Sequence, residues 1–207
     1  MMTAEQKAAW LSARAGLLTA SRMNDAMAFN SDGKPSAARI KYMEDLLTER
    51  TGTENAKHHV TDAMLHGVEY EDEAVDVFVE RYPQYIVRPS RFYLHPTIEH
   101  FGATPDRECG EDGLLEIKCP QPNTYRRWVI DGVVPEKHKN QMIAQCLCSG
   151  KTWVGFIAYD PTVREEGHRL FLRKYVPTAE ELAKVEQAAI TFLQELDLMF
   201  DKFVGAW

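Results

Sequence analysis

Residues 103–118 read Ala-Thr-Pro-Asp-Arg-Glu-Cys-Gly-Glu-Asp-Gly-Leu-Leu-Glu-Ile-Lys, and this stretch decides the fold class. The glycines at its centre are a turn signal, so residues 101–106 and 114–118 are predicted to pair as a β-hairpin that brings Asp106 beside Glu116. Side chains alternate along a strand, so Glu116 and Lys118 share one face and Ile117 lies on the other. Two carboxylates and an ammonium group on one strand face would make a poor hydrophobic core.

The same residue types suit a divalent metal ion. Mg²⁺ takes oxygen ligands from one or two carboxylates, keeps several waters and is completed by substrate phosphate. Lys118 would then orient or deprotonate an attacking water, or stabilise an anionic transition state. The alternative is an exposed strand in which Glu116 and Lys118 merely flank Ile117, because Asp followed by Glu-x-Lys is a weakly specific pattern.

An acidic helix is predicted over residues 61–81, and it concentrates the negative charge of the chain. The 207 residues have a formal net charge of −7, and residues 54–80 alone sum to −7. The helical period places Glu71 and Asp72 within an apolar stripe, which also contains Leu65, Val68, Val75, Phe78 and Val79. An unpaired carboxylate facing the core is costly, so a metal ion or a buried arginine is expected as its partner.

The remaining elements predict a mixed α/β domain, with a central, partly antiparallel sheet and helices against it. Further helices are expected at residues 4–15, 21–29, 36–50, 123–131, 135–149 and 179–203. Strands are expected at residues 85–88, 91–94, 101–104, 114–118, 153–159 and 169–176. The chain is 44% hydrophobic and 27% charged, which excludes disordered and collagen-like classes. The four cysteines form no CxxC pair and are expected to be reduced and buried.

Charge alone argues against nucleic acid as a partner, but the charge is unevenly distributed. A locally basic stretch between Lys118 and Lys151 includes Arg126 and Arg127. Next to these arginines, Trp128 either stacks on a nucleic-acid base or packs its helix onto the core. No segment of the sequence is apolar over the length needed to span a membrane, so a cytoplasmic protein is expected.

Ordered sequence blocks resemble the phage lambda exonuclease family, the YqaJ-type viral recombinase nucleases of the PD-(D/E)XK superfamily. The matching blocks are Trp10 with Arg14-Ala15-Gly16-Leu17-Leu18-Thr19-Ala20-Ser21, Gly67 with Tyr70-Glu71-Asp72-Glu73-Ala74, Thr104-Pro105-Asp106, Gly113-Leu114-Leu115-Glu116-Ile117-Lys118-Cys119-Pro120, Ala144-Gln145 and Tyr159-Asp160-Pro161. Each block alone is a weak signal, whereas their common order is strong. The resemblance implies a restriction-endonuclease-like core with a central mixed sheet flanked by helices and a helical N-terminal part.

The family resemblance also implies a domain organisation. Residues 1–207 would form a single exonuclease domain. Residues 1–60 would be a helical part with a 5′-phosphate pocket, residues 61–176 the catalytic core and residues 177–207 a C-terminal helix.

Site residues follow from the resemblance position by position. Asp106 and Glu116 would hold Mg²⁺ together with the backbone carbonyl of Ile117, and Lys118 would be the catalytic lysine. Glu71 would complete the metal site or position water, and Gln145 would support the scissile region. The residues expected to bind the 5′-phosphate or the DNA are Arg14, Ser21, Thr104, Arg126 and Arg127.

Two positions depart from the family pattern. Thr104 stands where the family often has Ser, and it keeps the hydroxyl group. Arg107 stands where the family often has Gly, so it either alters the backbone after Asp106 or adds a phosphate contact.

The implied activity is that of a magnesium-dependent 5′→3′ exodeoxyribonuclease acting on linear duplex ends. It would release 5′-mononucleotides and leave 3′ single-stranded overhangs, with two Mg²⁺ ions per site and Mn²⁺ able to substitute. A ring-shaped homotrimer, a single-strand annealing protein as partner and a bacterial or prophage origin are implied as well. The alternatives are a restriction-like or repair endonuclease on the same core, and a non-catalytic module that binds DNA ends. In the preferred reading, the negative charge lies on the exterior and positive potential is confined to an inner channel.

Overall fold

The computed structural model describes residues 13–52 and 62–206, with side chains in helix α4 described from Tyr70 onward. The helix expected at residues 4–15 therefore lies almost entirely outside the described residues. The strands are β1 (Leu18–Thr19), β2 (Val87–Pro89), β3 (Tyr93–Leu94), β4 (Phe101–Ala103), β5 (Arg107–Cys109), β6 (Gly113–Lys118), β7 (Trp153–Tyr159) and β8 (Leu170–Tyr175). The α-helices are α2 (Met23–Ala26), α3 (Ala37–Arg50), α4 (Asp62–Arg81), α5 (Pro122–Asp131), α6 (Glu136–Ser149) and α7 (Ala179–Val204), with short 3₁₀ helices η1 (Ala20–Arg22) and η2 (Glu166–His168).

A five-stranded mixed sheet in the order β2-β5-β6-β7-β8 forms the centre of the chain. Strands β6 and β7 pair in parallel, with Glu116 opposite Phe156 and Lys118 opposite Ala158. The other three pairings are antiparallel. A parallel pair needs a crossover connection, and helices α5 and α6 provide it. This agrees with the mixed sheet predicted from the sequence.

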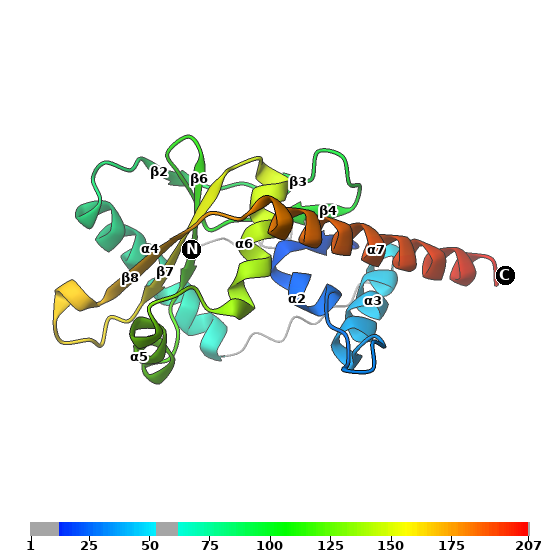
Figure 1. Cartoon of the computed structure of the whole chain (residues 1–207), viewed down its shortest axis with the longest axis horizontal. Coiled ribbons are helices and arrows are strands. Elements are labelled where there is room, and N and C mark those ends of the chain that lie inside the picture. The colour runs from blue at the N-terminus through cyan, green and yellow to red at the C-terminus, as the bar shows by residue number, and fades with distance from the viewer. Residues whose placement is uncertain (1–12, 53–61, 207) are drawn as a thin grey trace.

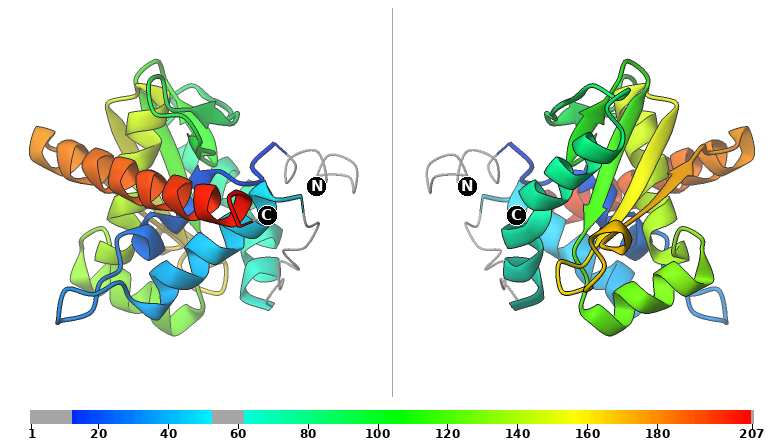
Figure 2. Two further views of the ribbon diagram at one scale, coloured as in Figure 1. Left: turned by 90° about the vertical axis from the view of Figure 1, so that its right-hand side faces the viewer. Right: turned by 90° about the vertical axis from the view of Figure 1, so that its left-hand side faces the viewer.

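Helices cover both faces of this sheet, as Figures 1 and 2 show. On one face, Ala74 and Phe78 of α4 pack against alternate residues of β6, Leu115 and Ile117. On the other face, α5 and α6 pack against Leu114 and the β7 residues that share its side of the sheet. Because the period of a strand is two, Glu116 and Lys118 are placed on the α6 face, together with Leu114.

The N-terminal segment forms a second layer around α6. Strand β1 pairs in parallel with β4, and β4 pairs antiparallel with β3, which makes a separate three-stranded sheet. Its core also contains residues of α2, α3, α6 and α7. Figure 1 shows α6 between the central sheet and this layer, with α7 running along the layer and its end projecting beyond the other elements.

Local signals explain where the long helices begin. The hydroxyl of Ser36 accepts a hydrogen bond from the Arg39 amide, which caps α3 at the position the sequence indicates. Thr178 and Glu181 form a reciprocal capping box at the start of α7. Within the part of the chain that the structure describes, no helix combines the length and the apolarity needed to cross a membrane.

Two sequence expectations about local structure are wrong, and the sequence does not predict strands β1 and β5. The hairpin partner of β6 is β5, whereas residues 101–103 belong to the other sheet. The sequence does not predict β5, because Arg107 and Glu108 give it no apolar alternation. The helix expected at residues 21–29 shrinks to η1 and the four-residue α2, and β1 precedes it.

Candidate active site

Glu116 is the most tightly held carboxylate of the site. Its side chain is completely buried on the α6 face of β6, where it forms an ion pair with Lys118. Two amides one helical turn apart on α6 donate to its two oxygens. The Gln141 amide is 2.6 Å from Oε1 and the Gln145 amide bonds Oε2. Every oxygen of this carboxylate is therefore oriented by a fixed donor.

Asp106 lies beside Glu116 because the loop between β4 and β5 follows the edge of β6. The Asp106 amide donates to the Leu115 carbonyl at 3.1 Å, and its Oδ2 accepts from the Ile117 amide at 2.6 Å. Burial and the charge of Glu116 raise the pKa of Asp106 well above its ordinary range. The two carboxylates therefore converge as the sequence predicts, although not through the predicted hairpin.

Lys118 and Glu71 complete the group of charges. Burial lowers the pKa of Lys118, but the charges of Glu116 and Asp106 outweigh this and raise it above its ordinary value. The charge of Glu71 also acts on both Asp106 and Lys118. All four charged residues expected at the metal site thus lie within electrostatic reach of one another.

Arg107 determines how α4 contributes to the site. Its guanidinium group bonds Glu71 at 2.8 Å and the Asp106 carbonyl at 2.7 Å. Its other nitrogen bonds Asp72 at 2.7 Å, and the Asp72 side chain is 82% exposed. The expectation that Asp72 faces the core is therefore wrong, whereas Glu71 is half-buried. An arginine, one of the two partners expected for a core-facing carboxylate, is therefore present at Glu71.

The carboxylates of Asp106 and Glu116 meet the requirements of a divalent cation. No group of three or more Cys, His, Asp or Glu side chains lies close enough to hold a metal among the residues described in 13–52 and 62–206. However, a hard cation such as Mg²⁺ needs only one or two carboxylates, a carbonyl and waters. Asp106 and Glu116 supply two carboxylates whose mutual repulsion raises the pKa of Asp106. These residues fit a cation that neutralises both charges.

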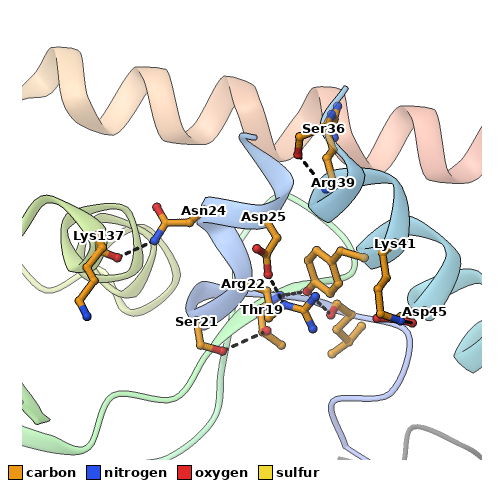
Figure 3. Close-up of polar contacts among 12 residues, drawn as sticks. Thr19, Ser21, Arg22, Asn24, Asp25, Ser36, Arg39, Lys41, Asp45 and Lys137 are labelled. Atoms are coloured by element: carbon orange, nitrogen blue, oxygen red, sulfur yellow. Dashed lines mark hydrogen bonds and ion pairs between the residues drawn. The ribbon is translucent and has the colours of Figure 1, made fainter. Parts of the chain in front are cut away.

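The N-terminal residues around Ser21 reach the same end of the molecule as Asp106, because β1 pairs with β4. The parallel pairing aligns Thr19 with Gly102, so Ser21 follows β1 where Thr104 follows β4. Figure 3 shows the hydroxyl groups of Ser21 and Thr19 facing each other, at 3.4 Å, and the Arg22 guanidinium bonded to Asp25. The Thr104 hydroxyl is buried and has no hydrogen-bond partner among the described residues. The structure thus places Ser21 and Thr104 on adjacent chain segments. Thr104 is two residues before Asp106 in the sequence.

The three candidate arginines occupy different places. Arg14 is half-buried, with its guanidinium 5.9 Å from the centre of the Phe92 ring. Arg126 and Arg127 are exposed on α5. Arg126 bonds Asp160 at 3.5 Å, and Asp160 directly follows the end of β7 that lies beside Lys118. Arg126 therefore lies at the same sheet edge as Lys118, and nothing in the structure brings Arg127 to that group.

Sequence reasoning missed Gln141 and left the role of Trp128 open. The spacing of Gln141 and Gln145 places both amides on one helix face, and this signal was available. Trp128 is buried, and its ring packs edge-on against Phe156, so it belongs to the core. The four cysteines are buried and free, as expected.

Comparisons with known proteins show which family and which solved structures the chain is similar to. The family described as the YqaJ-like viral recombinase domain matches residues 9–152. The chain is similar to the solved alkaline exonuclease LHK-Exo from Laribacter hongkongensis, with 31% identity, a TM-score of 0.87, and coverage of 96% of this chain and 97% of that chain. The structure of LHK-Exo in complex with dAMP matches with 31% identity, a TM-score of 0.85, and 95% coverage of each chain.

A more distant structure shares the fold alone. The phage-related exonuclease from Haemophilus somnus 129PT is 9% identical, with a TM-score of 0.67 over 90% of this chain and 96% of that chain. No curated protein sequence matches the chain.

Proposed function

The chain belongs to the YqaJ-like viral recombinase domain family, and from this premise we propose that it is a magnesium-dependent 5′→3′ exodeoxyribonuclease acting on ends of linear duplex DNA. Its fold is the restriction-endonuclease-like PD-(D/E)XK core that the sequence predicts, and the chain is a nuclease. The proposal adds the metal, the direction of digestion and the products, which are 5′-mononucleotides and 3′ single-stranded overhangs.

One observation carries the proposal: the buried carboxylate of Glu116 and the half-buried carboxylate of Asp106 converge beside the half-buried Lys118 at the edge of the central sheet. Asp106 is fixed by the Ile117 amide, and Glu116 is fixed by Lys118 and two glutamine amides. Such an arrangement costs stability unless a ligand compensates the charge. A pre-oriented acidic site of this kind is suited to phosphodiester hydrolysis.

Asp106, Glu116 and the carbonyl of Ile117 would hold the cation. When bound, a divalent cation lowers the pKa of a coordinated water and polarises the scissile phosphate. The Lys118 ammonium, kept charged by its pairing with Glu116, stabilises the negative charge that develops on the phosphate. Gln141 and Gln145 keep both oxygens of Glu116 in place, and Glu71, oriented by Arg107, positions water. Mn²⁺ can substitute because it also accepts carboxylate and water ligands.

The 5′→3′ direction depends on recognition of the 5′-phosphate. We assign this recognition to Arg14, Ser21 and Thr104, because a guanidinium and hydroxyl groups are good phosphate donors. The buried, unpaired hydroxyl of Thr104 supports the assignment, since such a group is costly without a partner. Arg126 and Arg127 would contact the DNA backbone. The alkaline exonuclease that is 31% identical supports the exonuclease activity.

The domain organisation and the assembly belong to the same proposal. Residues 1–207 would act as one exonuclease domain, with end recognition in residues 1–60, catalysis in 61–176 and a C-terminal helix in 177–207. A homotrimer around the DNA would explain processivity, and a single-strand annealing protein would receive the overhang.

A digestion assay with matched DNA ends tests the proposal. Linear duplexes with a 5′-phosphate or a 5′-hydroxyl, and a closed circular duplex, would be incubated with the wild type, Lys118→Ala, Arg14→Ala and the exposed-site control Lys34→Ala. We expect mononucleotide release from linear DNA with Mg²⁺ and not with Ca²⁺, and faster release from phosphorylated ends. Lys118→Ala should lose at least about 100-fold in rate, since it removes a charge that stabilises the transition state.

Each variant has a separate role in the test. Arg14→Ala should lose the preference for phosphorylated ends, and Lys34→Ala should behave like the wild type. Equal cutting of circular DNA would overturn the exonuclease proposal in favour of an endonuclease. Activity that survives in Lys118→Ala would overturn the assigned site.

A further inference from the structure

Two asparagine side chains join the N-terminal segment to helix α6. The Asn24 amide donates to the Lys137 carbonyl at 2.5 Å, and the Asn140 amide donates to Asn24 Oδ1 at 2.9 Å. Figure 3 shows Asn24 extending from α2 toward Lys137. Both polar atoms of the Asn24 side chain are therefore used to bind α6, and we call this pair of contacts the asparagine bracket.

The asparagine bracket lies between the two halves of the proposed site. On its N-terminal side, Asn24 is three residues beyond Ser21. On the α6 side, Asn140 directly precedes Gln141, whose amide donates to Glu116 at 2.6 Å. A displacement of α2 along α6 would therefore change the distance between Ser21 and Glu116.

The apolar packing at this interface draws on both segments, with Ala20, Met23 and Ala26 from the N-terminal segment and Ile143 and Ala144 from α6 in one core cluster. Apolar contacts are non-directional and allow small helices to slide, whereas hydrogen bonds are directional. The asparagine bracket thus supplies the directional contacts that set the register of α2 on α6.

We propose that Asn24 and Asn140 are positioning residues that hold the 5′-phosphate-binding segment in register with Glu116 and thereby determine which phosphodiester is cut. This inference rests on the function proposed above. An enzyme that binds the terminal phosphate and cuts at a fixed distance from it releases products of one length. If the phosphate-binding segment shifts relative to Glu116, a different phosphodiester is cut and phosphorylated ends are digested with a smaller preference.

Variants of both asparagines test the inference under single-turnover conditions with Mg²⁺. Asn24→Ala removes both hydrogen bonds of the bracket and Asn140→Ala removes one. Asn24→Asp keeps the shape while it replaces the donor with a carboxylate that repels the Lys137 carbonyl. The matched control is Asn30→Ala, because among the described residues the Asn30 side chain bonds the Pro35 carbonyl, within its own loop. Products would be sized from duplexes with 5′-phosphate and 5′-hydroxyl ends.

Product length and end preference are the diagnostic readouts. We expect dinucleotides to appear beside mononucleotides in the bracket variants, and the ratio of rates on phosphorylated and unphosphorylated ends to fall by about fivefold. The double variant Asn24→Ala/Asn140→Ala should lose no more than the stronger single variant, because one bracket is broken in each case. Asn30→Ala should release mononucleotides with the full preference. Thermal unfolding would show whether each variant is folded. If Asn24→Ala does not fold, the milder substitution Asn24→Ser takes its place.

The outcomes separate this inference from the proposed function. If the wild type releases mononucleotides with an end preference and the folded bracket variants do the same, the positioning role is overturned. A uniform loss of rate with unchanged products and preference would overturn it as well. A wild type without any preference for phosphorylated ends would instead overturn the proposed function.

Discussion

At the scale of single residues, the site combines repulsion with rigid support. Asp106 and Glu116 lie side by side, and burial together with the charge of Glu116 raises the pKa of Asp106, although the charge of Lys118 opposes this. Four donors, from Ile117, Lys118, Gln141 and Gln145, hold the two carboxylates in place. Such sites sacrifice stability for function, because one ammonium group compensates only part of the charge of two carboxylates.

The substitution Asp106→Asn tests whether the repulsion between Asp106 and Glu116 lowers the stability of the protein. It removes one buried charge while an amide oxygen remains available to the Ile117 amide. We expect the metal-free protein to gain free energy of unfolding, because burial and the charge of Glu116 disfavour the ionised form of Asp106, and to lose nuclease activity. Urea unfolding in the presence of a chelator and a digestion assay would measure the two effects.

The control for this prediction is Asp112→Asn, since Asp112 is exposed in the turn between β5 and β6. Its stability should change by less than about 0.5 kcal/mol and its activity should remain. A destabilised Asp106→Asn protein would contradict the repulsion argument.

At the scale of elements, the sequence predicted what local periodicity encodes and missed what tertiary pairing decides. The long helices and the central strands β6 and β7 agree with the structure. The two-residue strands β1 and β3 exist only through pairing with β4, so no local signal marks β1. The convergence of Asp106, Glu116 and Lys118 was predictable from motif spacing. The part played by Arg107 was not, because it depends on where α4 packs.

The turn between β3 and β4 contains a histidine whose neutral form is built into the structure. His95 Nδ1 accepts hydrogen bonds from the Thr97 and Ile98 amides, at 3.2 and 3.0 Å. Its Nε2 lies 3.8 Å from Glu186. Burial lowers the pKa of His95 below its ordinary value of 6.5, although the charge of Glu186 opposes this. A proton on Nδ1 would abolish both amide contacts.

The sign of the pH dependence follows from this lowered pKa. The unfolded chain binds the proton at a higher pH than the folded protein does, so His95 stabilises the fold fully above about pH 6.5. This contribution is lost as the pH falls through the folded pKa. We expect about 1 kcal/mol less stability on acidification, measured as urea unfolding at pH 7.5 and 5.5.

The variant His95→Asn provides the comparison, because its amide oxygen can accept from the turn without titrating. Its loss of stability between the two pH values should be smaller than that of the wild type by the same amount. An identical pH dependence in both proteins would rule out His95 as the cause.

At the scale of the whole molecule, α7 is bound to the N-terminal layer by an almost completely buried arginine. Arg39 bonds both oxygens of Glu195 at 2.9 Å. Its guanidinium lies 4.9 Å from the ring centres of Phe29 and Phe192. Two of its nitrogen atoms, Nε and Nη1, are buried without a hydrogen-bond partner in residues 13–52 and 62–206. The contact therefore joins distant parts of the chain through packing as much as through charge.

Two substitutions of Arg39 separate these contributions. Arg39→Ala should cost about 3 kcal/mol or more in free energy of unfolding, because it leaves a cavity between two aromatic rings. Arg39→Met keeps most of the volume and removes the unpaired donors, so it should recover most of that loss. Urea unfolding followed by circular dichroism would measure both. Equal losses in the two variants would show that the ion pair, rather than the packing, holds α7.

The parallel pairing of β6 with β7 has a consequence for the order of events during synthesis. Asp106, Glu116 and Lys118 leave the ribosome before the glutamines of α6 and before β7, which completes the centre of the sheet. Domains assemble as their segments emerge, and long-range strand pairing is the slow step. A growing chain thus carries the proposed catalytic groups for some time without the scaffold that aligns them. These groups are aligned only once β7 (Trp153–Tyr159) has left the ribosome and paired with β6.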